Sequence, residues 1–526
     1  MPTKTGKQEN DAQHIEIGKK TAGVATSIIT GRFLALILSG IAFIIVARIL
    51  GPSTYGIFTI AIAFATFFGA FGDIGVGTAF SKLVGQYIVK NDKESIRKVL
   101  SNGYAIMLIT GTIFTIIAIL SSGLIAHYAL GSSSHTFIVQ VASLIIILSI
   151  MYSASYYATI GFGNGKYIAI VILMQSVLQS IFSIILVYMK FGAMGPIIGT
   201  IIGYSVGLVF SLFIIVYKFK IRFPMPSFKG MKDLLGFSAP ISIYTGLRGV
   251  VNNLSPILLG LFATTIIVGN YGVALRTANL FLLVTDSITF ALLPMFASTL
   301  SIESLGKSLN KIYNYAIYMT FVIMVPAMFY IAVLAKQFSY TVFSASYMLT
   351  PIYISVISIG ILFWAVATYT TMLLIGRNLV KDVLKYAIMI AIMEFALMSI
   401  LIPLFKGYGL VVLLYIISPV VMSSLSVMIA SKKLSVMLNT SKLARVIAAG
   451  IISALLILPI AYLSSDYILV LVLGLIEQLL VYPPLLAIIG GADKEDLDTI
   501  KRLSHGLPII NFALETLSDY SAYFVR

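Results

Sequence analysis

The sequence predicts an all-α membrane protein whose helices cross the bilayer many times. Of its 526 residues, 59% are hydrophobic and only 10% are charged, and the mean hydropathy is +1.03. A soluble domain carries charge on about a quarter of its residues, so a soluble globular class is excluded. Apolar stretches of about 20 residues recur from Ala22 to Ile489, and a helix of that length crosses a hydrocarbon core of roughly 30 Å.

Fourteen such stretches are expected to be membrane-spanning helices. They cover residues 22–47, 55–80, 99–121, 136–160, 167–189, 193–217, 234–262, 267–293, 312–335, 350–375, 383–403, 408–431, 443–464 and 467–489. Residues 1–21 are polar and the first stretch is too long for the apolar part of a cleavable signal peptide, so the N-terminus is expected to be a cytoplasmic tail.

Lysine and arginine gather on alternate loops, which sets the expected orientation in the plasma membrane. If the N-terminus is cytoplasmic, 28 of the 35 basic residues lie on cytoplasmic segments, and the outside loops hold only Arg48, Lys190, Lys336 and Lys406. Both termini are therefore expected in the cytoplasm. A basic surface facing anionic membrane lipids accounts for the net charge of +16, so no nucleic-acid partner is expected.

The chain repeats itself at a spacing of 216 residues. Arg32 and Arg248 each lie near the middle of an apolar stretch, and each is followed 23 residues later by Tyr-Gly, at Tyr55-Gly56 and Tyr271-Gly272. Aligned without gaps, these two segments of 25 residues share seven identities. Each repeat holds six predicted helices, an even number, so the repeats are expected to share one orientation, with an axis along the membrane normal.

The predicted organisation is therefore two six-helix lobes followed by two further helices. The expected parts are a cytoplasmic N-terminal tail at 1–21, an N-lobe at 22–217, a basic cytoplasmic linker at 218–233, a C-lobe at 234–431, helices thirteen and fourteen at 432–489 and an amphipathic cytoplasmic tail at 490–526. Two parallel bundles around a central cleft are the arrangement expected of an alternating-access transporter.

The duplicated arginines are the main candidates for substrate binding. An arginine at mid-bilayer costs roughly 2.5–3.5 kcal/mol, so Arg32 and Arg248 are expected to face a wet interior and an anionic group. Guanidinium suits phosphate because its planar fork donates two hydrogen bonds and stays charged. A purely structural ion pair is the alternative. Arg276 is a third candidate, expected near the outer headgroups, where its side chain can extend toward water.

Four acids in apolar surroundings are candidates for ion coupling or ion pairing, because all would be costly against lipid: Asp73, Asp286, Glu394 and Glu477. Asp73 and Asp286 occupy nearly equivalent positions in the repeat, since shifting 73 by 216 gives 289. They are expected to couple transport to H⁺ or Na⁺, or to pair with the arginines. For Glu394 and Glu477, the alternative is a protonated, hydrogen-bonded carboxyl.

Other patterns indicate packing rather than chemistry. Gly195, Gly199, Gly203 and Gly207 recur every four residues, a spacing that lets helices approach closely. The tyrosine-rich run Met151–Tyr157 is interpreted mainly as packing and interfacial anchoring, with substrate stacking as the alternative. Cysteine is absent and the histidines lack partners at metal-ligand spacing, so no metal, cofactor or catalytic residue is predicted.

Several segments resemble the polysaccharide transporter family, the Wzx-type flippases of lipid-linked oligosaccharides, within the multidrug/oligosaccharidyl-lipid/polysaccharide (MOP) exporter superfamily. They are ARILGPSTYG (Ala47 to Gly56), FGDIGVGTAF (Phe71 to Phe80), VGNYGVALR (Val268 to Arg276), ALLPMFA (Ala291 to Ala297) and GGADKEDLDTIKRL (Gly490 to Leu503). The resemblance spans nearly the whole chain, and the LGPxxYG turn is its most specific element.

The resemblance implies a V-shaped, MATE-like pair of lobes that moves a polyprenyl- or dolichyl-linked oligosaccharide from the cytoplasmic to the outer leaflet. It also implies that Arg32 and Arg248 contact the lipid diphosphate, and that the last two helices accommodate the lipid tail. One departure is Ser255, where many relatives carry an acid, so a coupling role at that position is not expected.

Other functions stay open at this stage. A multidrug extruder of the same fold would bind cationic drugs through carboxylates, whereas the leading charges here are arginines. A membrane-embedded glycosyltransferase or polymerase would need a substantial outer loop or acids at a membrane face, and Ser121 to Thr136 contains no Arg, Asp or Glu. A scaffold without transport would leave the intramembrane charge unexplained. The sequence does not predict the glycan, lipid carrier, coupling ion, final glycoconjugate or oligomeric state.

Overall fold

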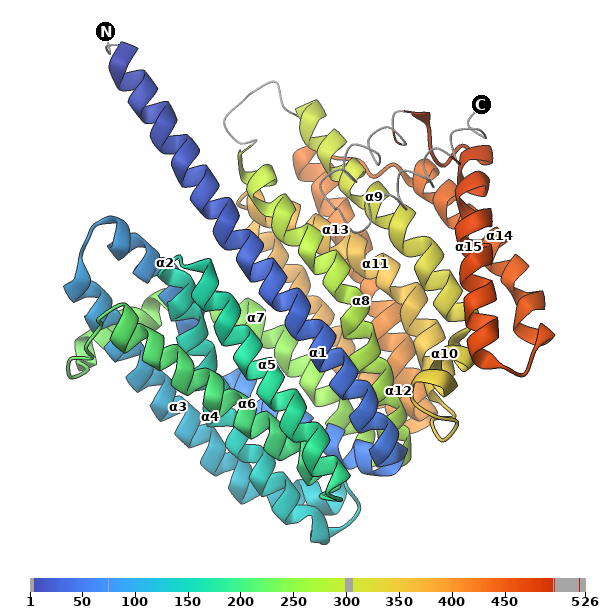
Figure 1. Ribbon diagram of the computed structural model, residues 1–526, viewed down its shortest axis with the longest axis horizontal. Helices are drawn as coiled ribbons and strands as arrows, with labels where there is room; N and C mark the ends of the chain where they lie inside the picture. The colour runs from blue at the N-terminus through green and yellow to red at the C-terminus, as the bar shows by residue number, and fades with distance from the viewer. Residues whose placement is uncertain (1–3, 74, 299–305, 495, 497–519, 521–526) are drawn as a thin grey trace. The chain divides into compact units, whose positions relative to one another are not determined.

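The computed structural model describes the backbone of residues 4–73, 75–298, 306–494, 496 and 520. Side chains are described for residues 30–73, 75–236, 238, 249–251, 253–282, 285, 309–461, 464–494, 496 and 520. Throughout these residues the secondary structure is helical, without a strand (Figure 1). The all-α class predicted from the sequence is confirmed.

The chain divides into two compact units, residues 1–269 and 270–526. The helices of unit 1 are α1 (Lys4–Gly72), α2 (Val76–Val89), α3 (Lys93–Tyr128), α4 (Thr136–Gly161), α5 (Gly165–Tyr188), α6 (Met194–Phe213) and α7 (Phe228–Phe262). Helix α8 (Thr265–Ser298) begins in unit 1 and continues into unit 2. Unit 2 also holds α9 (Gly306–Val333), α10 (Ala335–Val342), α11 (Thr350–Gly376), α12 (Val380–Val412), α13 (Ser418–Leu434), α14 (Thr440–Leu463) and α15 (Tyr467–Ile488).

Ten helical stretches among the described residues are long and apolar enough to cross a membrane. The two longest, Thr30–Gly72 and Val380–Leu434, each contain a backbone break, at Gly51 and Lys406, where the sequence predicts a loop between two spans. Helices α7 and α8 run over residues that are only partly described. The structure is therefore compatible with fourteen spans.

The LGPxxYG segment forms the turn between the first two predicted spans. Gly51 has φ 68° and ψ 171°, a left-handed conformation that costs glycine little, and Pro52 restarts the helix with its fixed φ. Gly56 then allows a close approach to the start of α8, because a Cβ there would lie within 1.9 Å of the Thr265 carbonyl oxygen. The most specific motif of the sequence is thus a turn with tight packing on both sides.

The second predicted span is interrupted between α1 and α2. Helix α1 ends at Gly72, and Gly75 has φ 73°, again a left-handed conformation. The Gly75 N–H donates to Asp73 Oδ1 at 3.2 Å, and Thr110 Oγ1 donates to the Gly72 carbonyl at 3.0 Å. Backbone groups freed at membrane depth must find such partners, so the break is held by specific bonds.

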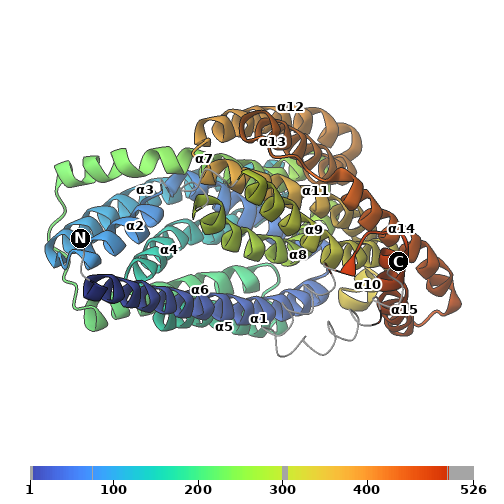
Figure 2. The ribbon, with the colours of Figure 1, turned by 90° about the horizontal axis from the view of Figure 1, so that it is seen from above.

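The glycine stripe of α6 brings this helix against α5, as the spacing predicts. A Cβ on Gly203 would lie 2.9 Å from the Gln175 carbonyl oxygen, and one on Gly199 would lie 2.7 Å from the Ser183 backbone nitrogen. Figures 1 and 2 show α5 and α6 side by side, with α1 running along them. Close backbone approach, rather than large side chains, therefore forms this contact.

The basic linker is fixed to the N-terminal part of α3. Asn102 Oδ1 accepts the Ser227 N–H at 2.7 Å, and Ser101 donates to the Pro224 carbonyl. Ser227 then caps α7 by accepting the Gly230 N–H at 3.2 Å. Helix α7 packs on α1, α2 and α3 and so belongs to unit 1. The lobe boundaries predicted from the sequence repeat stay predictions, because packing does not test the repeat.

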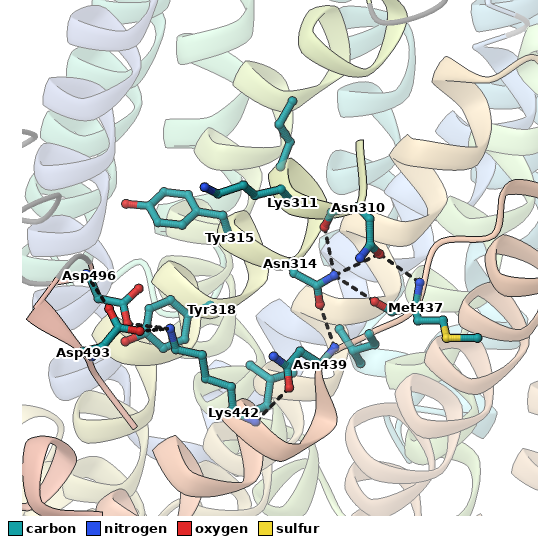
Figure 3. A pocket seen from close by; sticks show the side chains of 13 residues that line it. Asn310, Lys311, Asn314, Tyr315, Tyr318, Met437, Asn439, Lys442, Asp493 and Asp496 are labelled. Carbon is teal, nitrogen blue, oxygen red and sulfur yellow. Dashed lines mark hydrogen bonds and ion pairs between the residues drawn. The ribbon is translucent and has the colours of Figure 1, made fainter. Parts of the chain in front are cut away.

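The last two helices are bonded to α9 within unit 2. Three tyrosine hydroxyls donate to backbone carbonyls across this contact: Tyr318 to Gly491 at 2.9 Å, Tyr330 to Leu471 at 2.7 Å and Tyr482 to Val322 at 3.2 Å. Lys442, at the start of α14, pairs with Asp496 at 2.5 Å and Asp493 at 3.3 Å and lies 4.2 Å from the centre of the Tyr318 ring (Figure 3). Helices α14 and α15 are therefore an integral part of this unit.

Replacing Gly203 by leucine is expected to lower the melting temperature, because the added atoms must push α5 and α6 apart. Overpacking of this kind typically costs about 1–3 kcal/mol. The matched control is Gly123→Leu on α3, where a Cβ would meet nothing within 4 Å. Thermal unfolding of the purified proteins in detergent measures the difference, and an equal shift in both variants would contradict the packing role of the stripe.

Lys442→Met is expected to lower the melting temperature at neutral pH, because it leaves the nearly buried Asp496 carboxylate without its cation. The Asp496 carboxylate keeps the Asp493 N–H at 3.0 Å but loses a hydrogen bond from a charged group, which contributes about 1.5–3 kcal/mol. The control is Lys433→Met, which removes the more exposed pair with Asp382 and should change little.

The effect of Lys442→Met should also depend on pH. Burial favours a raised pKa for Asp493, but hydrogen bonds from Asp496 and the charge of Lys442 outweigh it and hold that pKa below its ordinary value. A carboxyl group whose pKa is lower in the folded than in the unfolded protein stabilises the fold above its unfolded-state pKa of about 3.9. That stabilisation is lost as the pH falls through its folded-state pKa. The gap in melting temperature between native protein and Lys442→Met should narrow below about pH 3.9. A gap that is constant with pH would exclude the ion pairs as its cause.

Candidate functional site

Arg32 lies on α1 in unit 1 and its side chain is exposed, within a helix that is otherwise apolar in this region. Its Nη2 donates to the hydroxyl of Tyr156 on α4 at 2.9 Å. Tyr156 is itself only 9% exposed and packs against Ala35 and Ile172. One end of the guanidinium is thus held by a buried, well-packed ring while the group as a whole remains accessible.

Three further tyrosines gather beside this contact. Tyr152 and Tyr157 lie on α4 and Tyr204 on α6, and the Tyr152 ring stacks on Tyr156 with centroids 6.2 Å apart and 20° between planes. Tyr204 lies 5.4 Å from Tyr152, and Tyr157 lies 5.4 Å from Tyr156. The positive charge of Arg32 acts on the hydroxyls of Tyr152 and Tyr157. The cation is therefore surrounded by aromatic hydroxyl groups.

Asp73 belongs to the same site. It occupies the helix break, accepts the Gly75 N–H, and lies within hydrogen-bonding reach of the Ser153 hydroxyl on α4. Tyr157 is within electrostatic reach of both Asp73 and Arg32. The structure thus brings together two of the predicted charged residues, one cation and one acid, around the tyrosines of α4.

The other predicted residues are not joined to this site by the described contacts. Arg248 and Asp286 lie on α7 and α8, but their side chains fall outside the described residues. Arg276 is exposed on α8, and Glu394 is half-buried on α12. Glu477 lies on α15, and both its carboxyl oxygens are buried without a hydrogen-bond partner among the described residues.

Unit 2 contains a separate polar cavity of about 810 Å³ at one end of α9, α14 and the segment after α15 (Figure 3). Asn310 and Asn314 line it and hold the α13–α14 loop: Met437 N–H donates to Asn310 Oδ1 at 3.0 Å and Asn439 N–H to Asn314 Oδ1 at 2.7 Å. Lys442 with its two aspartates closes another side. The polar groups of this cavity therefore fasten helices together.

The tyrosines are the site residues that the sequence interpretation assigned mainly to packing. The signal was present, because Tyr152 and Tyr156 are four residues apart and so share one face of a helix. What the sequence lacked was the placement of that face beside Arg32. Among the described side chains, no group of three or more His, Cys, Asp or Glu residues could hold a metal ion.

Solved structures show where else this fold occurs. The chain superimposes on a structure of the lipid II flippase MurJ in an inward closed conformation with a TM-score of 0.72 and 16% identity, covering 88% of this chain and 98% of the other. An inward-facing multidrug resistance MATE family transporter of the MOP superfamily gives a TM-score of 0.64 with 16% identity, covering 76% and 94%. At these identities the likeness concerns the fold.

A third structure is a MOP superfamily transporter from Pyrococcus furiosus, described as having a binding pocket of reverse polarity. It gives a TM-score of 0.54 with 18% identity, covering 79% of this chain and 95% of the other. The MATE-like fold expected from the sequence is therefore confirmed. No individual curated protein matches the sequence.

A family model decides the classification. The model of the polysaccharide biosynthesis protein family matches residues 45–351, which is more than half of the chain and includes the turn after the first span, the helix break at Asp73 and the start of α8. The resemblance noted in the sequence is thus confirmed, and this multi-pass membrane protein belongs to the polysaccharide biosynthesis protein family, with the fold of the MOP exporter superfamily.

Proposed function

We propose that this protein is a flippase that moves a polyprenyl- or dolichyl-diphosphate-linked oligosaccharide from the cytoplasmic to the outer leaflet of the plasma membrane, by alternating access and without catalysis. The family supports a role in polysaccharide synthesis, and the lipid II flippase shares the fold. The observation that carries the proposal is Arg32, an exposed guanidinium within an apolar helix that is bonded to the Tyr156 hydroxyl of the same unit.

The chemistry around Arg32 suits an anion more than a cation. The guanidinium is an exposed, permanently charged fork of N–H donors, one of which bonds the Tyr156 hydroxyl. A diphosphate offers several charged oxygens, which take paired hydrogen bonds from an arginine fork. An extruder of cationic drugs would place carboxylates, not guanidinium, foremost. The sequence repeat puts a second cation, Arg248, at the equivalent position, and we assign it the same role.

Arg32→Ala and Arg248→Ala are expected to slow flipping roughly ten- to hundredfold, because a hydrogen bond to a charged group contributes about 1.5–3 kcal/mol. The measurement is the rate at which a fluorescent polyprenyl-diphosphate glycan becomes protected from, or exposed to, a membrane-impermeant reagent in proteoliposomes. Lys98→Ala is the control, because this lysine pairs with Glu94 on the exposed start of α3.

Unchanged flipping in the folded arginine variants would reduce both arginines to structural roles. Transport of a cationic dye by native protein that does not flip the lipid-linked glycan would replace the proposal by a drug extruder.

Asp73 is our candidate for coupling to protons. Interrupted helices are a usual place for coupling ions in transporters, and Asp73 at this break shares Tyr157 as an electrostatic neighbour with Arg32. Asp73→Asn keeps an oxygen to accept the Gly75 N–H but cannot exchange a proton. Native flipping should accelerate several-fold under an imposed pH gradient, whereas Asp73→Asn should flip at one rate with or without it. A response that survives in the variant would assign Asp73 to structure alone.

A further inference from the structure

The polar surface beside Arg32 extends beyond what a diphosphate needs. Tyr152, Tyr156 and Tyr157 of α4 and Tyr204 of α6 present hydroxyl-bearing rings within the membrane-spanning part of unit 1. Phenylalanine or leucine would pack as well and would avoid the cost of placing a hydroxyl group among apolar side chains. Tyr152, Tyr157 and Tyr204 are only half-buried, so part of their surface is accessible.

The backbone around these rings is shaped to admit them. A Cβ on Gly207 of α6 would lie 2.6 Å from the Tyr152 ring, and a Cβ on Gly77 of α2 would lie 2.7 Å from the Tyr157 ring. Any larger residue at either position would displace an aromatic side chain. The absence of a side chain at these two glycines therefore leaves room for the rings of Tyr152 and Tyr157, in addition to letting helices approach closely.

A row of amides continues the surface along α5. Gln175 Nε2 donates to Gln179 Oε1 at 2.5 Å, and Gln179 Nε2 donates to Thr200 Oγ1 of α6 at 3.1 Å. Both glutamines are half-buried. An amide has two donor hydrogens and an oxygen with two lone pairs, so these bonds leave capacity for a ligand. Helices α1, α4, α5 and α6 thus contribute one guanidinium, aromatic faces and amides.

This combination is suited to a sugar. The C–H face of a pyranose ring packs on an aromatic face, and its hydroxyls exchange hydrogen bonds with amides and phenols. The first sugar of a lipid-linked glycan is bonded directly to the diphosphate. A diphosphate on Arg32 therefore places that sugar next to Tyr156, whose hydroxyl lies 2.9 Å from the guanidinium, and next to the ring of Tyr152 stacked on it.

We propose that Tyr152, Tyr204 and Gln179 form a subsite for the sugar nearest the diphosphate, so that this unit recognises the sugar as well as the phosphate. The inference rests on the proposed function, and it adds a specificity that Arg32 alone would not give. Tyr156 has a shared role, because it both packs in the core of unit 1 and orients the guanidinium.

The test compares two ligands that differ only in the sugar: a polyprenyl diphosphate bearing one sugar and the same polyprenyl diphosphate bearing none. Binding to the full-length protein in detergent and flipping in proteoliposomes are measured for both. Native protein should bind the sugar-bearing lipid about tenfold more tightly than the bare one. Tyr152→Leu and Gln179→Met should each remove most of that preference, and Gln179→Met should bind the bare diphosphate as native protein does.

Two further variants separate recognition from folding. Tyr152→Phe keeps the ring and should keep most of the preference, which shows that a loss in Tyr152→Leu comes from the aromatic face. Tyr188→Leu is the matched control, because Tyr188 is 67% exposed at the end of α5, away from the cluster.

Each outcome decides the subsite. Equal binding of the two lipids by native protein, or a preference unchanged in Tyr152→Leu and Gln179→Met, would overturn it even if flipping occurs. A preference that depends on these residues, in a protein that flips neither lipid, would support the subsite and overturn the flippase. Absence of binding to either lipid would overturn both.

Discussion

The cost of placing the charge of Arg32 inside an apolar helix is the constraint around which unit 1 is organised. A guanidinium at membrane depth must meet water or polar atoms. The fold supplies one such atom, the Tyr156 hydroxyl, at 2.9 Å, and holds its ring in a core formed by α1, α4 and α5. Because the helix face that carries Tyr156 also carries Tyr152, satisfying the arginine creates a larger polar surface. Structure and recognition thus depend on one contact.

The helix break at Asp73 leaves backbone groups that also need polar partners. Interrupting a helix at membrane depth frees backbone groups, and here a carboxylate takes one N–H while Thr110 supplies a donor for the Gly72 carbonyl. The break also places Asp73 within electrostatic reach of Tyr157, which is within electrostatic reach of Arg32 as well. A cation and an acid thus share Tyr157 as an electrostatic neighbour.

In unit 2, specific contacts attach the two additional helices, α14 and α15. Helices α14 and α15 expose many apolar side chains, but they also bury Ile457 and Val470 in a cluster with Leu334. Directional bonds add to this packing: tyrosine hydroxyls donate to backbone carbonyls, and Lys442 joins the start of α14 to the segment after α15. The polar cavity of this unit follows from that fastening.

The sequence by itself determined the membrane class, the helical fold, the turn at Gly51 and the close packing at the glycine stripe, and it nominated Arg32 and Asp73 as candidates. Hydropathy, glycine spacing and the price of intramembrane charge are local or compositional properties, so they can be read along the chain. Only the tertiary structure decided that Tyr156 bonds Arg32, that Tyr152 and Tyr204 lie beside Tyr156 in turn, and that α7 packs with α1, α2 and α3. The physical reason is that a tyrosine in an apolar helix satisfies packing and recognition equally well. Its role depends on which neighbours the helix contacts, and no spacing within the helix specifies them.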